Sequence, residues 1–346
     1  MAKTFLAALL GALVLAGCGG GGDSSSNGGG YHVGVKPGKS QSPAGVSAPA
    51  RVKARFAANG PTIGRCPVFP TNMQWNMPVD KLPVLSGSSQ MIGAIGGGDP
   101  IHPDFGSGRW KGGKIGIPFT VASTAVAKRP VVFSDARYSD PGPYPLPAST
   151  EIEAVPGRNT DRHALVVDTA ACKLYELYQA EPDAGGASWR AGSGAVWDLR
   201  SLQLRPDGWT SADAAGLPIF PLLVRYDEVK AGAINHALRI AVPKTRKGWI
   251  YPARHDSSDS TDSNLPMMGQ RMRLKKSIDE SSFGPQARVI VRALKRYGVI
   301  VADQGAPWHL PGAPDDRWEI SQFFALENKL HGNDFEVVDT TNLPRS

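Results

Sequence analysis

Residues 163–179 read HALVVD-TAAC-KLYELYQ and decide the fold class of this chain. Two runs rich in Val, Leu and Tyr flank a short turn that Asp168 opens. Extended runs of this composition, bounded by turn residues, predict a β-hairpin. We therefore expect the chain around this stretch to form strands as well.

Further strand candidates lie on both sides of the hairpin. They share β-branched or aromatic residues and end at turn residues, and they cover residues 115–122, 130–133, 193–199, 222–226, 236–242, 249–251, 271–275 and 299–302. Helices are predicted over residues 285–297, between Pro285 and a capping Gly298, and over 320–330. Many short strands with few helices predict a mainly β fold, either a β-sandwich or jelly-roll-like domain or a β-rich α+β domain.

The N-terminus has the pattern of an export signal. A positively charged start precedes an apolar run over residues 5–16 and a group of small residues. The run is shorter than the roughly 20 residues that cross a bilayer. Residues 15–18, Leu-Ala-Gly-Cys, resemble the lipobox of bacterial lipoproteins. The resemblance implies that residues 1–17 are removed and that Cys18 carries a lipid; an ordinary signal peptide is the alternative.

Composition divides the rest of the chain into a tether and one domain. Residues 18–62 are rich in Gly, Ser and Pro and predict a disordered tether, whereas residues 63–346 are long enough for a single globular domain. The formal net charge is +7. For an exported protein this charge favours glycan, cell wall or lipid as partners rather than nucleic acid. We expect attachment to a membrane through the lipid alone, in the cell envelope outside the cytoplasm, with the choice of membrane and the oligomeric state left open.

The cysteine count indicates one cross-link. Of three cysteines, the lipobox uses Cys18, which leaves Cys66 and Cys172. In an oxidising compartment such a pair predicts a disulfide, which would close a loop of about a hundred residues and stabilise the fold by on the order of 4 kcal/mol. Two buried thiols are the alternative.

Three acids are candidates for a carboxylate pair of the glycosidase type. Glu176 lies in the run KLYELY, Asp198 in the next strand and Asp213 in a Gly/Pro-rich loop. Glycoside hydrolysis uses one carboxylic acid and one carboxylate. Trp197 and Trp209 would offer flat faces for sugar rings. The alternatives are a solvent-facing or edge-strand position for Glu176 and structural burial of the tryptophans.

A second constellation is typical of β-elimination on an acidic polysaccharide. Arg can neutralise a substrate carboxylate, and Tyr or His can remove a proton; the residues are Arg225, Tyr226, His236 and Arg239. The alternative is an ion-pair network that includes the adjoining Asp227 and Glu228.

Two further histidine sites are weaker. His255 begins a Ser-rich loop with Asp256, Asp259 and Asp262, either a Ca²⁺-binding loop or an ordinary flexible one. His102 and Asp104, held between prolines, form either a metal or catalytic pair or a capped turn. The sequence has no nucleotide, zinc or EF-hand motif, so we expect no cofactor and no metal.

The blocks DRHALVVD, LYELY, WDLRS, DGWTSADAAGLPIFP and LVRYDE resemble a group of exported bacterial proteins. This resemblance covers most of the chain from Cys66 onward and implies an exported globular domain, without a reaction.

We therefore predict a lipid-anchored exported protein that binds or processes extracellular polysaccharide. The enzyme version is a glycoside hydrolase or polysaccharide lyase, and its catalytic candidates are Glu176, Asp198, Asp213, Arg225, His236 and His255. The ligand-binding candidates are Trp197, Trp209, Tyr226 and Arg239. The alternative is a non-catalytic envelope lipoprotein that binds a cell-wall polymer or a protein partner.

Overall fold

The computed structural model describes residues 60–122, 126–153 and 161–345. Cys18, the predicted signal peptide and nearly all of the predicted tether lie outside these residues. Within the described ranges, no helix has the length and apolar character needed to cross a membrane.

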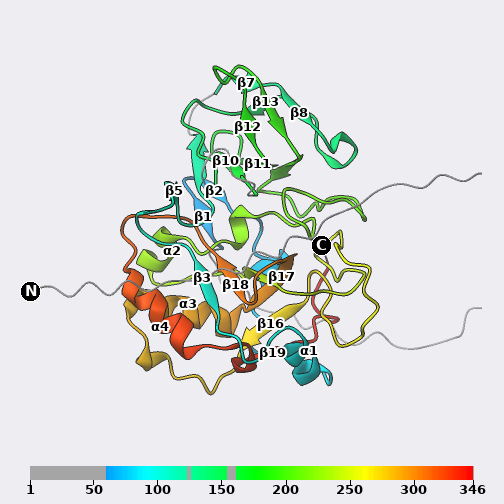
Figure 1. Ribbon diagram of the computed structural model, residues 1–346, viewed down its shortest axis with the longest axis vertical. Helices are drawn as coiled ribbons and strands as arrows, with labels where there is room; N and C mark the ends of the chain where they lie inside the picture. The colour runs from blue at the N-terminus through cyan, green and yellow to red at the C-terminus, as the bar shows by residue number, and fades with distance from the viewer. Residues whose placement is uncertain (1–59, 123–125, 154–160, 346) are drawn as a thin grey trace, which may run out of the picture. The chain divides into compact units, whose positions relative to one another are not determined.

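The domain is a β-rich α+β fold, one of the two predicted forms (Figure 1). Its largest sheet has six strands in the order β19-β16-β17-β15-β18-β3. These are β3 (His102–Asp104), β15 (Leu238–Val242), β16 (Arg271–Leu274), β17 (Val299–Gln304), β18 (His309–Pro311) and β19 (Phe335–Val337). Two neighbouring pairs, β15–β17 and β18–β3, are parallel. Parallel pairs distinguish this sheet from an antiparallel jelly roll.

A second sheet has four strands in the order β14-β11-β10-β6. They are β6 (Phe119–Ala122), β10 (Ala164–Asp168), β11 (Lys173–Tyr178) and β14 (Ser193–Asp198). The predicted hairpin is confirmed, because β10 and β11 pair in antiparallel fashion. Asp168 Oδ1 accepts hydrogen bonds from the backbone N–H groups of Ala170 and Ala171, which fixes the turn.

The four-stranded sheet is buried on both faces. Leu165 and Val167 of β10 enter the main core, whereas the alternate residues Ala164 and Val166 enter a second, smaller core. Near that second core lies a three-stranded sheet of β8 (Val131–Phe133), β12 (Glu181–Pro182) and β13 (Trp189–Ala191). Short two-stranded ribbons complete the strands: β1 (Thr62–Ile63) with β2 (Cys66–Pro67), β4 (Arg109–Trp110) with β5 (Gly113–Lys114), and β7 (Lys128–Arg129) with β9 (Tyr144–Pro145).

Cys66 and Cys172 form the predicted disulfide, with their Cα atoms 5.4 Å apart. The bond joins β2 to the turn of the β10–β11 hairpin across 106 positions of the chain. Both residues are buried. Cross-links of this kind persist in oxidising compartments.

The helices are α1 (Ser88–Ala94), α2 (Tyr226–Ala231), α3 (Pro285–Arg296) and α4 (Ile320–Lys329). The two predicted helices are α3 and α4; α3 packs against β16 and against α4, which in turn contacts β3 (Figure 1). Pro285 occupies the first turn of α3, and Gly298 follows its end with a φ of 68°.

The strand predicted over residues 222–226 is wrong. A 3₁₀ turn covers Phe220–Leu222, and α2 begins at Tyr226 and is capped at its C-terminus by Gly232, which has a φ of 89°. The apolar run here is buried, and a short buried run fits a strand or a helix equally well on periodicity. The predicted strand at 249–251 reduces to a single bridge between Trp249 and Met268.

Candidate functional site

Titratable side chains line one face of four adjacent strands in the six-stranded sheet. Ala241 of β15 lies opposite Asp303 of β17 on one side and opposite His309 of β18 on the other. His309 in turn lies opposite His102 of β3. Paired residues in a sheet project to the same face, so these side chains form a continuous row. We call Asp303, His309 and His102, together with Arg239 and Asp104, the polar row.

A β-bulge brings Asp303 into the polar row. Arg239 pairs with Ile300, and the register then shifts, so that Ala241 pairs with Asp303. In a regular register Ala241 would pair with Ala302, and Asp303 would point to the opposite face. Bulges commonly redirect a side chain beside a functional site. Here the redirected carboxylate lies 3.6 Å from Nη2 of Arg239.

Asp213 and Asp303 share the guanidinium group of Arg239. Asp213 Oδ1 accepts a hydrogen bond from Arg239 Nη2, the same nitrogen that Asp303 approaches. The Asp213 side chain is 1% exposed, whereas that of Asp303 is 30% exposed. Burial raises the pKa of Asp213 to about 6, against the opposing effect of Arg239. Within the described residues Asp213 Oδ2 and Arg239 Nε have no hydrogen-bond partner, although both atoms are buried.

Two imidazoles hold the backbone on either side of Asp213. His163 Nε2 lies 3.1 Å from the carbonyl oxygen of Ala212, and His255 Nδ1 donates to that of Ala214 at 2.9 Å. His163 also pairs with Glu153 at 2.5 Å. Burial alone would lower the pKa of His163, but the Glu153 carboxylate raises it to about 9. His163 is therefore a cation at neutral pH.

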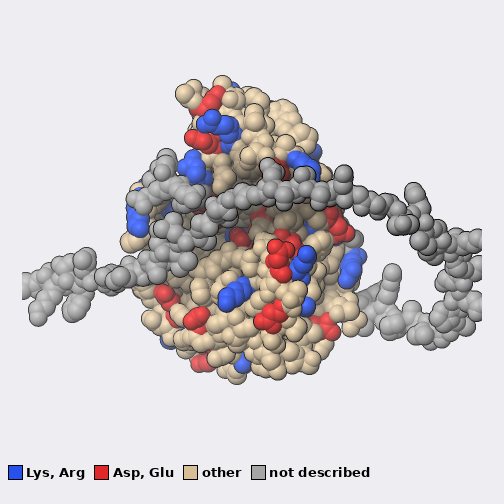
Figure 2. All heavy atoms as spheres, turned by 45° about the vertical axis from the view of Figure 1, so that its right-hand side comes forward, with Lys and Arg blue, Asp and Glu red and all other residues tan. Residues whose placement is uncertain are grey.

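Carboxylates outnumber cations around Arg239. Arg239 and protonated His163 are the positive groups, and the negative groups that act on them are Asp213, Asp303, Glu153 and Asp161. Such an excess favours neutral or cationic ligands over polyanions. On the face of the molecule in Figure 2, acidic and basic side chains are interspersed.

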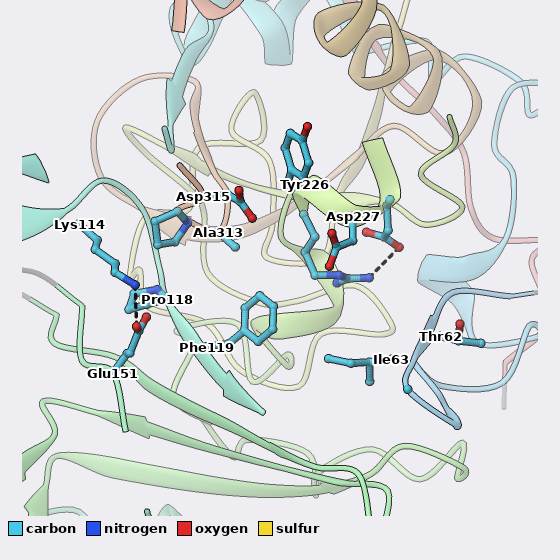
Figure 3. Close-up of a pocket in the computed structure, with 14 residues that line it drawn as sticks. Thr62, Ile63, Lys114, Pro118, Phe119, Glu151, Tyr226, Asp227, Ala313 and Asp315 are labelled. Carbon is cyan, nitrogen blue, oxygen red and sulfur yellow. Dashed lines mark hydrogen bonds and ion pairs between the residues drawn. The ribbon is translucent and has the colours of Figure 1, made fainter. Parts of the chain in front are cut away.

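A pocket of about 460 Å³ lies between β6, α2 and residues 313–315 (Figure 3). Two ion pairs line it: Lys114 with Glu151 at 2.6 Å and Arg225 with Glu228 at 2.8 Å. The rings of Phe119 and Tyr226 add apolar surface. The volume falls in the range of small-molecule sites, about 300–1,000 Å³.

Arg225 and Tyr226 of the second predicted constellation line this pocket, and His236 contacts Arg225. Arg225 Nη2 lies 3.3 Å from His236 Nε2, and Glu228 Oε2 lies 3.1 Å from the same nitrogen. His236 is fully buried behind the pocket, with Nδ1 donating to the carbonyl oxygen of Ala237. Arg225 also donates to the carbonyl oxygen of Phe220 at 2.6 Å. Arg225 and His236 thus form an ion-pair network with Glu228. Asp227, which the alternative interpretation also included, pairs with Arg317 instead, and Arg239 lies apart with Asp213.

Glu176 lies in the main core, away from the polar row. It is fully buried and accepts hydrogen bonds from Nε1 of Trp197 and from the backbone N–H groups of Ile219 and Phe220, at 2.9–3.0 Å. Burial raises its pKa to about 7 despite these three donors. The contacts fix the loop that carries Asp213, so the geometry gives Glu176 a structural role.

Asp198 and the two tryptophans are also apart from the polar row. Asp198 is exposed at the end of β14, where Oδ1 accepts from the backbone N–H of Arg200. Trp197 is buried, and the guanidinium of Arg205 lies 5.9 Å from its ring centroid and 5.4 Å from that of Trp209. Neither tryptophan lines the pocket of Figure 3.

Sequence reasoning missed several members of this region. Asp303 and His309 lie far along the chain from Asp213, Glu153 precedes the predicted hairpin, and His163 is the hairpin's first residue. Asp303 and His309 could have been identified by their positions near the ends of two strands, β17 and β18, that neighbour β15. The acids of the Ser-rich loop after His255 do not gather: within the described ranges, three potential metal-ligand side chains converge at His102, Asp104 and His309 alone.

Comparisons with known proteins give no relative. No family model matches the chain, and no curated protein or solved structure matches it either.

Proposed function

We propose that this domain hydrolyses a neutral extracellular glycan at the polar row. One observation carries the proposal: two carboxylates share Arg239, one buried with a raised pKa and one reaching solvent. Pairs of acids whose environments separate their pKa values are the pattern of acid and base roles in glycosidases.

The exposures of the Asp303 and Asp213 side chains assign their roles in the proposed hydrolysis. Asp303, 30% exposed, is the carboxylate that a substrate can reach, and it acts as nucleophile or base. Asp213 is assigned the acid role, because burial favours its protonated form and its Oδ2 has no partner in the described structure. Its side chain is 1% exposed, so the role requires substrate binding to move Asp213 into hydrogen-bond reach of the leaving-group oxygen. Arg239 positions both.

The shared nitrogen also sets the stereochemistry. Asp213 Oδ1 and Asp303 Oδ2 both contact Nη2 of Arg239, so these two oxygens lie close together. Their separation is smaller than the distance of about 6.5–9.5 Å between the two carboxyl groups of an inverting glycosidase. The short spacing favours a retaining, two-step hydrolysis.

The charge balance selects the substrate class. The excess of carboxylates around Arg239 repels a polyuronate, whose elimination would need an unopposed cation. Arg225, the other candidate cation, is occupied by Glu228 and Phe220. A hydrolase acting on a neutral glycan is therefore favoured over a lyase.

A screen of the purified protein against neutral and acidic polysaccharides tests this proposal. We expect new reducing ends from a neutral glycan and no unsaturated product. Unsaturated products from an acidic glycan would contradict hydrolysis and direct attention to Arg225 and Tyr226. Binding without any product would favour the second candidate.

The second candidate is a non-catalytic glycan-binding module that uses the pocket of Figure 3. The observation in its favour is the combination of paired charges and two aromatic rings in a pocket of about 460 Å³. Paired side chains can exchange hydrogen bonds with sugar hydroxyls, while rings pack on sugar faces. Tyr226→Ala should weaken glycan binding at this pocket, whereas Asp303→Asn, outside the pocket lining, should leave binding unchanged.

The proposal includes a lipid anchor at Cys18. The lipobox resemblance supports it, and the Cys66–Cys172 disulfide agrees with an oxidising compartment outside the cytoplasm. Mass spectrometry of the mature N-terminus tests it: a diacylated Cys18 is expected, and an unmodified N-terminus at another residue would contradict it.

A further inference from the structure

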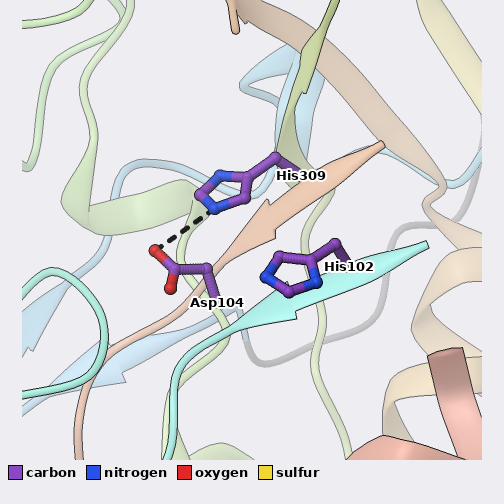
Figure 4. Close-up of side chains that lie close together, drawn as sticks. All are labelled: His102, Asp104 and His309. Carbon is purple, nitrogen blue, oxygen red and sulfur yellow. Dashed lines mark ion pairs between the residues drawn. The ribbon is translucent and has the colours of Figure 1, made fainter. Parts of the chain in front are cut away.

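Three potential metal ligands converge at one end of the polar row. The ligand atoms of His102, Asp104 and His309 all lie within 4.8 Å of one another (Figure 4). The sheet register causes this, because β18 and β3 are parallel with His309 opposite His102 and Pro311 opposite Asp104. Side chains two apart on a strand share a face, so Asp104 joins both histidines. The two imidazole rings stack with centroids 5.5 Å apart.

We propose that His102, Asp104 and His309 bind a divalent transition-metal ion of the zinc class. Two imidazole nitrogens and one carboxylate oxygen suit Zn²⁺, whereas Ca²⁺ and Mg²⁺ prefer oxygen ligands. Three protein ligands leave a fourth position for water or substrate, which is the arrangement of catalytic rather than structural zinc.

The distances suit a tetrahedral ion. His309 Nε2 lies 3.4 Å from Asp104 Oδ2. Two ligands that are each about 2.0–2.1 Å from a tetrahedral zinc ion are separated by about 3.4 Å. The ligand atom of His102 lies within 4.8 Å of the other two, and its side chain, which is 45% exposed, completes the set by a small rotation. The side chains of Asp104 and His309 are also partly exposed, so an ion can enter from solvent.

The carboxylate of Glu327 orients His102. Glu327 of α4 lies 3.4 Å from Nδ1 of His102, the ring nitrogen that this contact occupies. The other nitrogen, Nε2, is left for the ion. Histidine ligands in metal sites regularly bond a carboxylate through the second nitrogen, and this contact fixes the ring and raises its basicity. Glu327 is therefore a positioning residue for the proposed site.

Metal binding is measured without any glycan, so a failure of this proposal is distinguishable from a failure of the proposed hydrolysis. The experiment uses untagged protein that has been stripped with a chelator. Titration calorimetry with Zn²⁺ gives stoichiometry and affinity, and the visible absorption of added Co²⁺ reports coordination geometry.

We expect one ion per chain and a tetrahedral Co²⁺ spectrum. His309→Ala and the isosteric Asp104→Asn should each weaken binding by about 100-fold or more, and Glu327→Gln by about 10-fold. His331→Gln serves as the matched control, because His331 caps a 3₁₀ turn outside the site and should leave affinity unchanged. Thermal unfolding of each metal-free variant confirms that it is folded.

Two results would overturn the proposal. One is a folded wild-type protein that binds no Zn²⁺ at micromolar concentrations. The other is Zn²⁺ binding of equal affinity in the wild type, His309→Ala and Asp104→Asn, because the ion would then lie elsewhere.

Discussion

The guanidinium group of Arg239 lies 3.6 Å from the carboxylate of Asp303, although a regular parallel register would place the two side chains on opposite faces of the sheet. The β-bulge after Ile240 makes this contact possible. It also places Asp303 beside the buried pair of Arg239 and Asp213. One irregularity of backbone pairing thus creates the carboxylate pair on which the proposed hydrolysis depends.

The ionisation of Asp213 should determine how the rate of hydrolysis falls at high pH. Its pKa is raised to about 6, and the acid role needs the protonated form. We expect kcat/KM to fall as the pH rises through about 6. In Asp213→Asn this dependence should disappear together with about 10²–10⁴-fold of the rate. A pH–rate profile of both proteins checks this; a limb that persists in the variant would assign the acid role to another group.

Glu176 should make the protein less stable as pH rises. Its folded pKa of about 7 lies above the usual 4.5, so the folded state binds the extra proton between these values. This proton's contribution to the free energy of unfolding is complete below pH 4.5 and is lost as the pH rises to 7. For a pKa shift of this size, the loss is about 3 kcal/mol. Glu176→Gln should flatten this part of the curve.

Urea unfolding between pH 4.5 and 7.5 measures the Glu176 effect. Asp198→Asn is the matched control, because Asp198 is exposed on the neighbouring strand β14. Parallel curves for the wild type and Glu176→Gln would show that Glu176 ionises normally in the core.

The disulfide should contribute strongly to stability. It closes a loop of 106 positions, and the chain-entropy model assigns such a loop on the order of 4 kcal/mol. The double variant Cys66→Ala, Cys172→Ala should lose about 2–4 kcal/mol of the free energy of unfolding. Reduction of the wild type should produce the same loss. Equal stability with and without the bond would mean that the hairpin and β2 hold together by packing alone.

The small side chain of Ala241 should be required for substrate to bind at the polar row. Ala241 pairs with Asp303 on one side and with His309 on the other, so a larger side chain at this position would occupy the space between those two residues. Ala241→Leu should fill that space and lower kcat/KM by at least about 10-fold, while Ala231→Leu, at the exposed end of α2, should not. Glycan turnover by both variants, with unfolding curves, checks this. Unchanged turnover in Ala241→Leu would place the substrate elsewhere.

Local features of the fold were predictable from sequence, because short-range patterns determine them. The β10–β11 hairpin follows from two β-rich runs and Asp168, and α3 from Pro285, Gly298 and helical periodicity. The run at 222–226 was predicted incorrectly, since a short buried apolar segment has no distinguishing period.

The candidate site was predictable only in part. Asp213 stood out because it lies in a loop without a strand role. Its partner Asp303 could not be identified, because its face depends on a bulge that leaves no clear mark in the sequence. His309 joins His102 only through the parallel pairing of two strands far apart in the chain. Strand order and register are long-range properties, so these contacts require the structure.

The most direct test of the proposed function compares glycan hydrolysis by the wild type, Asp303→Asn and Asp198→Asn. Both substitutions remove one exposed or partly exposed carboxylate, but only Asp303 contacts Arg239. The release of reducing ends from the neutral glycan identified in the screen is measured at pH 5.5, with unfolding curves for each protein. We expect Asp303→Asn to lose about 10²–10⁴-fold in kcat, while Asp198→Asn matches the wild type. Hydrolysis by Asp303→Asn at the wild-type rate would contradict the proposed site.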